Sequence, residues 1–231
     1  MPARYHGLPA NEQSTNRINA KLLDLVLADF EFTNTWFDDT ARPVWTHLIP
    51  QLSPARILEI GSYEGASACF LINQLAGKQR IELHCVDSWI GGPEHRATDM
   101  TEVEARFRRN LERATAAFPD RVDLHVHKGP SDRRLAMLLA DAKAGYFDFV
   151  YVDGSHQAPD VLCDAVLAFR LLKVGGMMAF DDYLWAEEMP YGRDPLRCPK
   201  PAIDAFTNLY ARKLRILVAP LVQLYIQKIA D

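Results

Sequence analysis

Short apolar runs alternate with longer segments of helical spacing, and this alternation constrains the fold more than any other feature of the sequence. The runs that have the length and apolar character of strands cover residues 56–60, 81–86, 122–127, 147–152 and 177–180. Helical spacing fills residues 66–75, 102–118, 132–140 and 161–172. Such alternation predicts an α/β fold with a doubly wound sheet, in which right-handed crossovers join parallel strands and helices cover both faces.

The two ends of the chain depart from this alternation. Residues 15–50 are predicted to form two helices, so that residues 1–50 make a helical cap on the sheet. A proline-rich stretch, 184–201, is predicted to be a lid loop, and a helical stretch follows over 203–210. The last two apolar runs, hinged at Ala219-Pro220, predict an antiparallel pair that closes the sheet edge. The expected sheet is therefore seven-stranded and mostly parallel, with a reversed C-terminal strand.

Length and composition narrow the class of protein. A chain of 231 residues with 48% apolar side chains can bury one large core, so we expect a single domain over 1–231. The net charge of −4 is spread along the chain, which argues against nucleic acid or a membrane as partner and favours a small molecule. Neither a signal peptide nor a run of eighteen apolar residues is visible, so a cytoplasmic location is expected. Four scattered cysteines fit no zinc motif.

A glycine-containing turn follows the first predicted strand in the segment ILEIGSYEGASACFL. The strand ends at Glu59, the chain turns through Gly61 and Gly65, and a helix begins at once. Glycines let backbone approach a ligand closely, and the free N–H groups of a helix start can receive a carboxylate. The spacing differs from the G-x-G-x-x-G of dinucleotide binders, so a pyrophosphate is the less natural ligand. A purely structural turn remains an alternative.

The second predicted strand ends at an acid. At this position Asp87 can accept two hydrogen bonds from a ribose diol, although an Asx turn or a helix N-cap would use the same residue. Ser88 and Trp89 follow, and the indole can form a wall for a purine or pack against the sheet edge. Because open α/β sheets bind ligands at the carboxyl ends of their strands, the ligand interpretation is favoured.

Three further acids follow neighbouring predicted strands. Asp153 comes after 147–152, and Asp181 and Asp182 come after 177–180. Crowded carboxylates raise one another's pKa unless a cation offsets their charge, and ligands that offer only oxygen favour Mg²⁺. In the alternative interpretation only Asp153 faces the site, while Asp181 and Asp182 cap the following turn. Sequence neighbours on a strand point to opposite faces, so the pair converges only if the strand ends there.

The segments ILEIGSYEG, CVDSW, KGPSDRRL, FDFVYVDGSH and LLKVGGMMAFDDY together resemble the successive motifs of class I S-adenosylmethionine (AdoMet)-dependent methyltransferases. They cover residues 55–183 in the expected order, and the resemblance implies a Rossmann-like methyltransferase fold that binds AdoMet. It places Glu59, Gly61, Ser62 and Gly65 around the methionine part, Asp87, Ser88 and Trp89 near the ribose and purine, Ser131 and Asp132 at the adenine, and Asp153 beside the cofactor. Ser131 is also a candidate helix N-cap.

VDGSH with a later FDDY is similar to the metal-dependent O-methyltransferases of catechol-like compounds and of sugars in secondary metabolites. In the sugar-modifying branch an Asp proposed as base often stands two places after the first metal-binding Asp, where this chain has Ser155. His156 therefore becomes the candidate proton acceptor, although a lone loop histidine is more often structural. The resemblance implies that Asp153, Asp181 and Asp182 bind Mg²⁺ or another divalent cation while a hydroxyl of an aromatic or sugar-containing metabolite attacks the sulfonium methyl.

Other functions stay open at this stage. A metal-independent methyltransferase or a non-catalytic AdoMet-binding protein would keep the glycines and Asp87, whereas a nicotinamide-dependent oxidoreductase would need a different glycine spacing. In the predicted lid, Trp185 and Tyr191 are candidates for stacking on the acceptor, with ordinary packing as the alternative. Trp36, Phe37 and Trp45 offer apolar surface for covering the site or for a homodimer contact.

Overall fold

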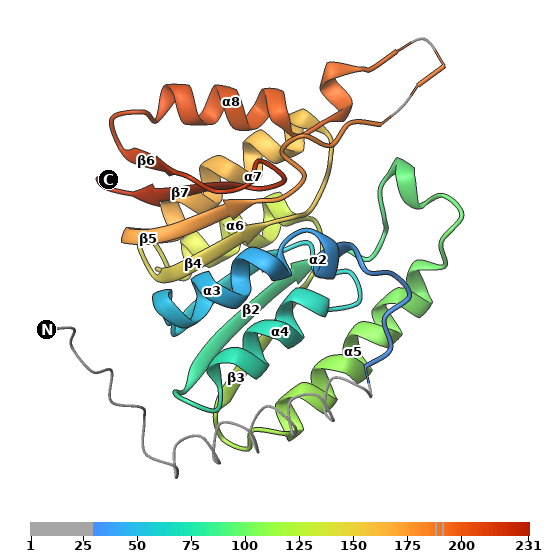
Figure 1. The fold of residues 1–231 in the computed structure, drawn as a ribbon, viewed down its shortest axis with the longest axis vertical. Helices are drawn as coiled ribbons and strands as arrows, with labels where there is room; N and C mark the ends of the chain where they lie inside the picture. Colours follow the sequence, from blue (N-terminus) through green and yellow to red (C-terminus); the bar gives the residue numbers. More distant parts are fainter. Residues whose placement is uncertain (1–29, 188, 191) are drawn as a thin grey trace, which may run out of the picture.

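The computed structural model describes residues 30–187, 189–190 and 192–231, and it contains one seven-stranded sheet covered by helices on both faces (Figure 1). The strands are β1 (Arg56–Ile60), β2 (Ile81–Asp87), β3 (Val122–Lys128), β4 (Phe147–Val152), β5 (Leu172–Phe180), β6 (Leu214–Leu217) and β7 (Leu224–Lys228). The helices are α2 (Trp36–Asp39), α3 (Arg42–Leu52), α4 (Ala66–Leu75), α5 (Met100–Ala116), α6 (Ser131–Ala140), α7 (Ala158–Leu171) and α8 (Lys200–Leu209). Short 3₁₀ helices, η1 (Pro93–His95) and η2 (Pro195–Arg197), lie in two loops.

The strand order is β3-β2-β1-β4-β5-β7-β6. The first five strands in this order are parallel, and β7 runs antiparallel to both β5 and β6. The predicted α/β class, the seven strands and the reversed C-terminal strand are thus confirmed. The order reverses at β1 and β4, so the loops that follow these strands open the crevice where such sheets bind ligands.

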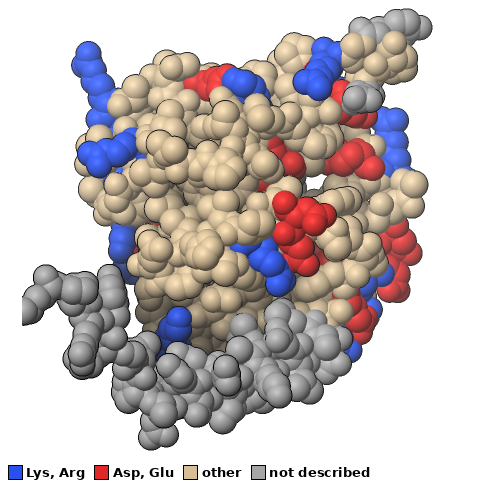
Figure 2. Space-filling model, in the orientation of Figure 1, with Lys and Arg blue, Asp and Glu red and all other residues tan. Residues whose placement is uncertain are grey.

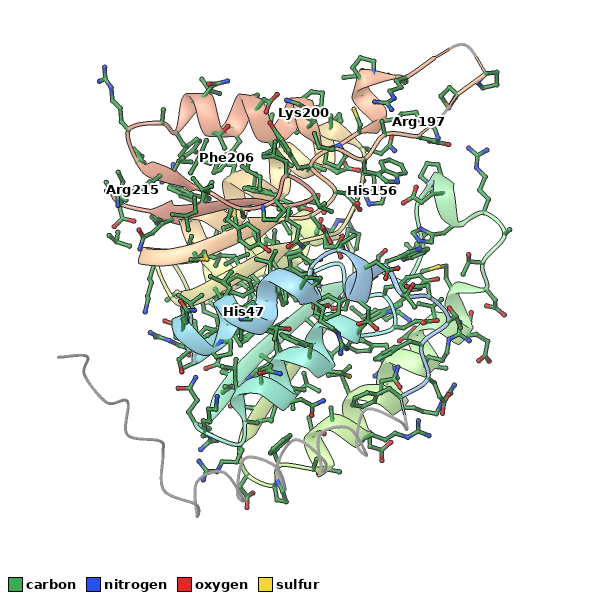
Figure 3. All side chains as sticks on the ribbon, viewed as in Figure 1. His47, His156, Arg197, Lys200, Phe206 and Arg215 are labelled. Carbon is green, nitrogen blue, oxygen red and sulfur yellow. The ribbon has the colours of Figure 1, made fainter. Side chains whose placement is uncertain are left out.

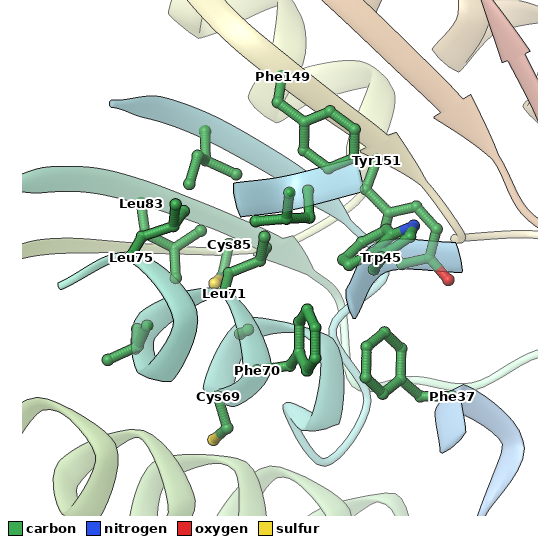
Figure 4. Packing of buried hydrophobic residues seen from close by; sticks show 14 of the residues in the cluster. Phe37, Trp45, Cys69, Phe70, Leu71, Leu75, Leu83, Cys85, Phe149 and Tyr151 are labelled. Carbon is green, nitrogen blue, oxygen red and sulfur yellow. The ribbon is translucent and has the colours of Figure 1, made fainter. Parts of the chain in front are cut away.

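Each face of the sheet has its own apolar core. On the face covered by α3, α4 and α5, Trp45 of α3 packs edge-on against Phe149 and Tyr151, at centroid distances of 5.3 and 4.7 Å (Figure 4). The other face packs against α6, α7 and α8, where Phe169 meets Phe206. Buried aromatic pairs of this kind add about 0.5–1.5 kcal/mol each beyond the area that they bury. Both cores keep the strand ends fixed relative to one another.

Element boundaries differ from the predicted ones mainly around β5. A helix was expected to run through Leu172, but α7 ends at Leu171 and β5 begins at once, pairing Leu172 with Phe147. The pairing shifts register between Phe147 and Phe149. Gly176 permits this bulge, because a Cβ atom there would lie 2.9 Å from the carbonyl oxygen of Lys173. Apolar periodicity gave no sign of the extra strand residues.

Only part of the predicted N-terminal helical cap falls within the described residues. Residues 15–29, which carry the first of the two expected helices, lie outside the described residues. The chain from 36 onward forms α2 and α3, and α3 covers the sheet. Among the helices of the described ranges, none combines the length and the apolar character needed to span a bilayer.

Candidate active site at the carboxyl edge of the sheet

Two neighbouring parallel strands deliver three ionisable side chains to one point at the carboxyl edge. Val152 pairs with Phe180, so the residues that follow β4 and β5 leave the sheet side by side. One ligand atom from each of Asp153, His156 and Asp182 lies within 4.8 Å of the others. Figure 3 shows His156 between this edge and the loop that carries Arg197, and Figure 2 shows acidic side chains gathered around a gap in the surface.

His156 contacts carboxylates through both ring nitrogens. Its Nε2 lies 2.8 Å from Asp182 Oδ2, and its Nδ1 lies 3.3 Å from Glu94 Oε1. Burial by itself lowers the pKa of this imidazole, but contact with Asp182 and Glu94 outweighs burial and raises the pKa to about 9. The ring of Trp185 lies 4.3 Å from that of His156, centroid to centroid. The imidazole is therefore a cation that offsets part of the local negative charge.

The pKa values of the nearby acids are also raised, which for a carboxyl group favours the neutral form. Burial, followed by the charges of Asp181 and Asp182, raises the pKa of Asp153 well above its usual range. Burial and the charge of Asp182 likewise raise the pKa of Asp181. This edge of the sheet therefore favours any further cation that can approach these acids.

The carboxylate of Asp181 is held by Tyr151 and Gln223, and its charge also raises the pKa of Asp153. Tyr151 donates its hydroxyl hydrogen to Oδ2, and Gln223 Nε2 donates to Oδ1 at 3.0 Å. The backbone N–H of Asp182 also donates to Oδ1, at 2.9 Å, and Asp182 has a left-handed φ of +54°. The sequence predicted all three acids as metal ligands, whereas the structure groups Asp153 and Asp182 with His156.

The loop after β1 is fixed by buried acids. Glu59 is fully buried and accepts hydrogen bonds from the hydroxyls of Ser62 and Ser67, both at 2.5 Å. Burial raises the pKa of Glu59. Asp87 accepts the backbone N–H groups of Ser62 at 2.8 Å and Tyr63 at 2.9 Å. Glu59 and Asp87 thus tie the ends of β1 and β2 to this loop.

Both positions in the loop require glycine, because a Cβ atom at either one would collide with a neighbouring segment of the protein. Gly61 has a φ of +85°, and a Cβ atom on it would lie 1.9 Å from the carbonyl oxygen of Asp153. Gly65 has the same φ, and its Cβ atom would lie 2.5 Å from Leu111 Cδ2. The sequence interpretation assigned them to close approach of a ligand. In the structure the close neighbours are the loop after β4 and helix α5.

Trp89 packs at the sheet edge, which is the alternative to a purine wall that the sequence left open. Its side chain is 5% exposed, donates its indole N–H to the carbonyl of Tyr63 and packs on Phe107. Its backbone N–H donates to Asp87 Oδ1 at 2.7 Å, which is the Asx turn that stayed open as an alternative. Trp89 is therefore a core residue that braces the loop, and the exposed surface beside it belongs to Ile90.

An aromatic group at the same edge escaped the sequence interpretation. Tyr63 lies 5.3 Å from Trp36 and 5.4 Å from His95, measured between ring centroids. Tyr63 has a left-handed φ of +48°, which is uncommon for a residue with a side chain. The sequence signal that could have found it is its place inside the glycine turn, between Gly61 and Gly65.

The remaining predicted positions lie around these loops. Ser131 and Asp132 start α6, whose N-cap is Pro130, so Ser131 is not the cap that the sequence suggested. Within 184–201 the predicted lid contains η2, and Arg197 forms an ion pair with Glu187. Trp185 faces His156, whereas Tyr191 lies outside the described residues.

Comparison with known proteins identifies the family. A family model described as a methyltransferase domain matches residues 58–183, which is more than half of the chain. The chain belongs to this methyltransferase family. The match begins inside β1 and ends just after Asp182, so it includes Asp153, His156 and Asp182. A search among curated proteins gave no match.

Solved structures share the fold of this methyltransferase at low sequence identity. An O-methyltransferase from Bacillus cereus in complex with SAH is 19% identical, with a TM-score of 0.57 over 96% of this chain and 92% of that chain. A putative caffeoyl-CoA O-methyltransferase from Staphylococcus aureus is 13% identical, with a TM-score of 0.58 over 96% and 100%. The O-methyltransferase TomG from Streptomyces achromogenes, in complex with SAM, is 18% identical, with a TM-score of 0.55 over 81% and 78%.

Proposed function

We propose that this protein transfers the methyl group of AdoMet to a hydroxyl of a small molecule, with help from a divalent cation at the carboxyl edge. The observation that carries the proposal is the convergence of Asp153, His156 and Asp182 beside the loop that follows β1. The family match supports methyl transfer, and the structural neighbours named above as O-methyltransferases favour oxygen as the acceptor atom.

The residues present fit a positively charged methyl donor. Asp153 lies next to the loop of Gly61, so its carboxylate and the ring of Tyr63 belong to the same edge. Aromatic faces and carboxylates both attract cations, and AdoMet carries a sulfonium. Asp87 stands at the tip of β2, where an acid can accept the hydroxyls of a ribose. Glu59, Ser62 and Gly65 hold the loop in shape, and Ser88, Ser131 and Asp132 flank it in the proposed cofactor site.

The same edge fits Mg²⁺ or a similar ion. Asp153 and Asp182 are the two carboxylates that would hold it, and magnesium sites in proteins often use one or two carboxylates with water and substrate as the other ligands. Asp181, through its contacts with Tyr151 and Gln223, would keep Asp182 in place. When bound, the ion supplies charge that lowers the pKa of an acceptor hydroxyl and fixes its position.

His156 is the proposed proton acceptor. In the reaction the acceptor oxygen forms a bond to the methyl carbon while the bond from that carbon to sulfur breaks, and the hydroxyl proton must leave. The Nε2 atom of His156 lies among the same acids that would hold the ion. In the structure Asp182 and Glu94 keep this imidazole protonated near neutral pH. Because a base must be neutral to accept a proton, we expect turnover to rise as the pH rises.

The test combines binding with turnover. Thermal shift with AdoMet, S-adenosylhomocysteine and NAD, each with and without Mg²⁺, reports the cofactor, since a ligand stabilises only the state that binds it. Turnover is followed as S-adenosylhomocysteine formed with a panel of vicinal diols and matched monophenols. We expect Asp153→Asn to retain its fold and lose at least about 100-fold in turnover, or about 2.7 kcal/mol of transition-state stabilisation.

Asp141→Asn is the matched control, because Asp141 is an exposed acid after α6. It should turn over like the unchanged protein. If AdoMet binds but turnover is indifferent both to chelator and to Asp153→Asn, the protein is a metal-independent methyltransferase. If only NAD gives a thermal shift, the cofactor assignment is wrong.

A further inference from the structure

A second cluster of ionisable side chains lies on the outer strands of the sheet, away from the carboxyl edge. Strand β3 alternates between an apolar face, with Leu124 and Val126 packed on the core, and a polar face with His125 and His127. In the adjacent strand β2, His84 pairs in register with His125. Polar side chains thus face the α6 side at the position where an apolar patch would be expected.

The polar atoms of this cluster converge. Glu82, His84 and His125 each offer a ligand atom, and these atoms lie within 4.8 Å of one another. His84 Nε2 lies 2.7 Å from Glu82 Oε1, and His84 Nδ1 lies 2.8 Å from His127 Nε2. The ring of His84 stacks on those of His125 and His127, at centroid distances of 4.4 and 5.0 Å.

We propose that Glu82, His84 and His125 bind one divalent transition-metal ion of the Zn²⁺ class, which clamps the outer strand β3 to β2. Imidazole suits zinc, nickel and copper, whereas an all-oxygen set suits magnesium, so the ligand chemistry differs from that of the carboxyl edge. Bonds of about 2.0–2.1 Å to a tetrahedral ion place neighbouring ligand atoms about 3.3 Å apart. The rings of His84 and His125 are stacked 4.4 Å apart, so His125 must turn out of this stack and leave Asp123 before both imidazoles can bind one ion, with water in the fourth position.

The surroundings of the cluster resemble the outer shell of a metal site. His127 holds the second nitrogen of the His84 ring, which fixes the orientation of that ring. Tyr146 donates its hydroxyl hydrogen to Glu82 Oε2 at 2.6 Å, and this leaves Oε1 toward His84. Lys143 Nζ lies 3.2 Å from Oε1. On binding, the ion displaces this ammonium from Oε1, and the single proton of the neutral His84 ring moves to Nδ1, where it is donated to His127 Nε2.

The cluster also has a route to solvent. The side chain of His84 is 2% exposed, whereas those of Glu82 and His125 are 20% and 41% exposed. An ion can therefore enter past His125 and reach the buried imidazole without unfolding the strand pair. Because β3 is the outermost strand on its side, an ion shared between β2 and β3 would stabilise the part of the sheet with the fewest neighbours.

The test measures Zn²⁺ binding by untagged protein that has been freed of metal, in competition with a chromogenic chelator. His125→Ala should raise the Zn²⁺ Kd of this site at least tenfold while leaving the circular dichroism spectrum unchanged. His47→Ala is the matched control, because His47 lies exposed on α3 (Figure 3) and should leave the Kd unchanged. His156→Gln changes the carboxyl edge and should leave this Zn²⁺ site intact.

Cobalt gives a second readout that does not depend on His84 variants, which could fail to fold. Co²⁺ bound by imidazoles and a carboxylate in a tetrahedral site shows intense visible absorption, and we expect this band in the unchanged protein and in His47→Ala but not in His125→Ala. Equal Zn²⁺ affinity in His125→Ala and the unchanged protein would overturn the proposal. So would loss of Zn²⁺ binding in His156→Gln, because the ion would then sit at the carboxyl edge.

Discussion

The imidazoles of His84 and His156 each have a carboxylate within 2.8 Å of Nε2, and the two side chains are only 2% and 16% exposed, yet their pKa values move in opposite directions. Burial is the largest single contribution at both rings, and acting alone it would lower both pKa values. At His84 the single contact with Glu82 cannot overcome burial and the nearby His125 and His127, so its pKa falls to about 4. At His156 the pKa rises to about 9, because Asp182 and Glu94 approach both nitrogens.

The difference shows how neighbours decide the charge of a buried histidine. One carboxylate leaves His84 neutral at pH 7, as a metal ligand must be, whereas two leave His156 charged. The second carboxylate at His156 comes from the loop that holds η1, far away in the sequence. The two regions therefore differ in how they can be perturbed. The carboxyl edge depends on loop positions, and the β2–β3 cluster depends on the register of two strands.

The largest expected effect comes from moving the loop of His156 without touching His84. Gly61→Ala places a Cβ atom 1.9 Å from the carbonyl oxygen of Asp153, at a φ of +85°. The loop must shift, and we expect a loss of about 3 kcal/mol or more in the free energy of unfolding. Urea denaturation measures this loss.

Gly145→Ala is the matched control near the second cluster. Gly145 has a φ of +63°, and among the described atoms none lies within 4 Å of its ideal Cβ position. Only the left-handed backbone is then penalised, at about 1 kcal/mol. If the two variants lose equal stability, contact between Gly61 and Asp153 is not what holds the edge together.

The pH dependence of stability comes next in size. The folded pKa of His156, about 9, lies above its ordinary value of 6.5, so its contribution is complete below pH 6.5 and is lost as the pH rises toward 9. The folded pKa of His84, about 4, lies below 6.5, so stability falls as the pH drops from 6.5 toward 4. These two losses form an alkaline arm and an acid arm of the stability profile, and each should reach on the order of 3 kcal/mol in full, with a limiting slope of about 1.4 kcal/mol per pH unit for one proton.

Two variants separate the arms. His156→Gln should reduce the alkaline arm, with the remainder coming from Glu59, Asp153 and Asp181, whose pKa values burial raises. His84→Gln should reduce the acid arm alone, with the remainder coming from half-buried His95 and His127, whose pKa values burial also lowers. Unfolding free energies from pH 5 to 9.5 measure both. An alkaline arm of unchanged size in His156→Gln would mean that these acids, and not His156, cause it.

The sequence was sufficient for the features that depend on local pattern. Strand periodicity located β1 to β4 within a residue or so, because buried parallel strands are continuous apolar runs. It also put Asp87 and Asp153 at strand tips, since parallel strands end at one edge of the sheet. These positions follow from order along the chain and need no knowledge of which loops touch.

Features that depend on contacts between distant segments could not be predicted from the sequence. Asp181 accepts hydrogen bonds from Tyr151 in β4 and from Gln223, which lies just before β7 and 42 residues farther along the chain. The need for Gly61 comes from the loop of Asp153, and Glu94 reaches His156 from a different loop. The β2–β3 cluster requires the register of His84 against His125, which neither strand encodes alone.

The smallest expected effect concerns the ring that lies against His156. Trp185 packs on that imidazole at 4.3 Å between centroids, and an aromatic face stabilises a nearby cation by about 0.5–1 kcal/mol. Trp185→Leu should therefore lower the pKa of His156 slightly, as seen in the titration of its ring resonances by NMR. Trp36→Leu is the control, since Trp36 contacts Tyr63 and His95 instead. A His156 pKa that is unmoved in Trp185→Leu would leave Asp182 and Glu94 as the whole source of the raised value, and would reduce the contrast with His84 to the number of carboxylates alone.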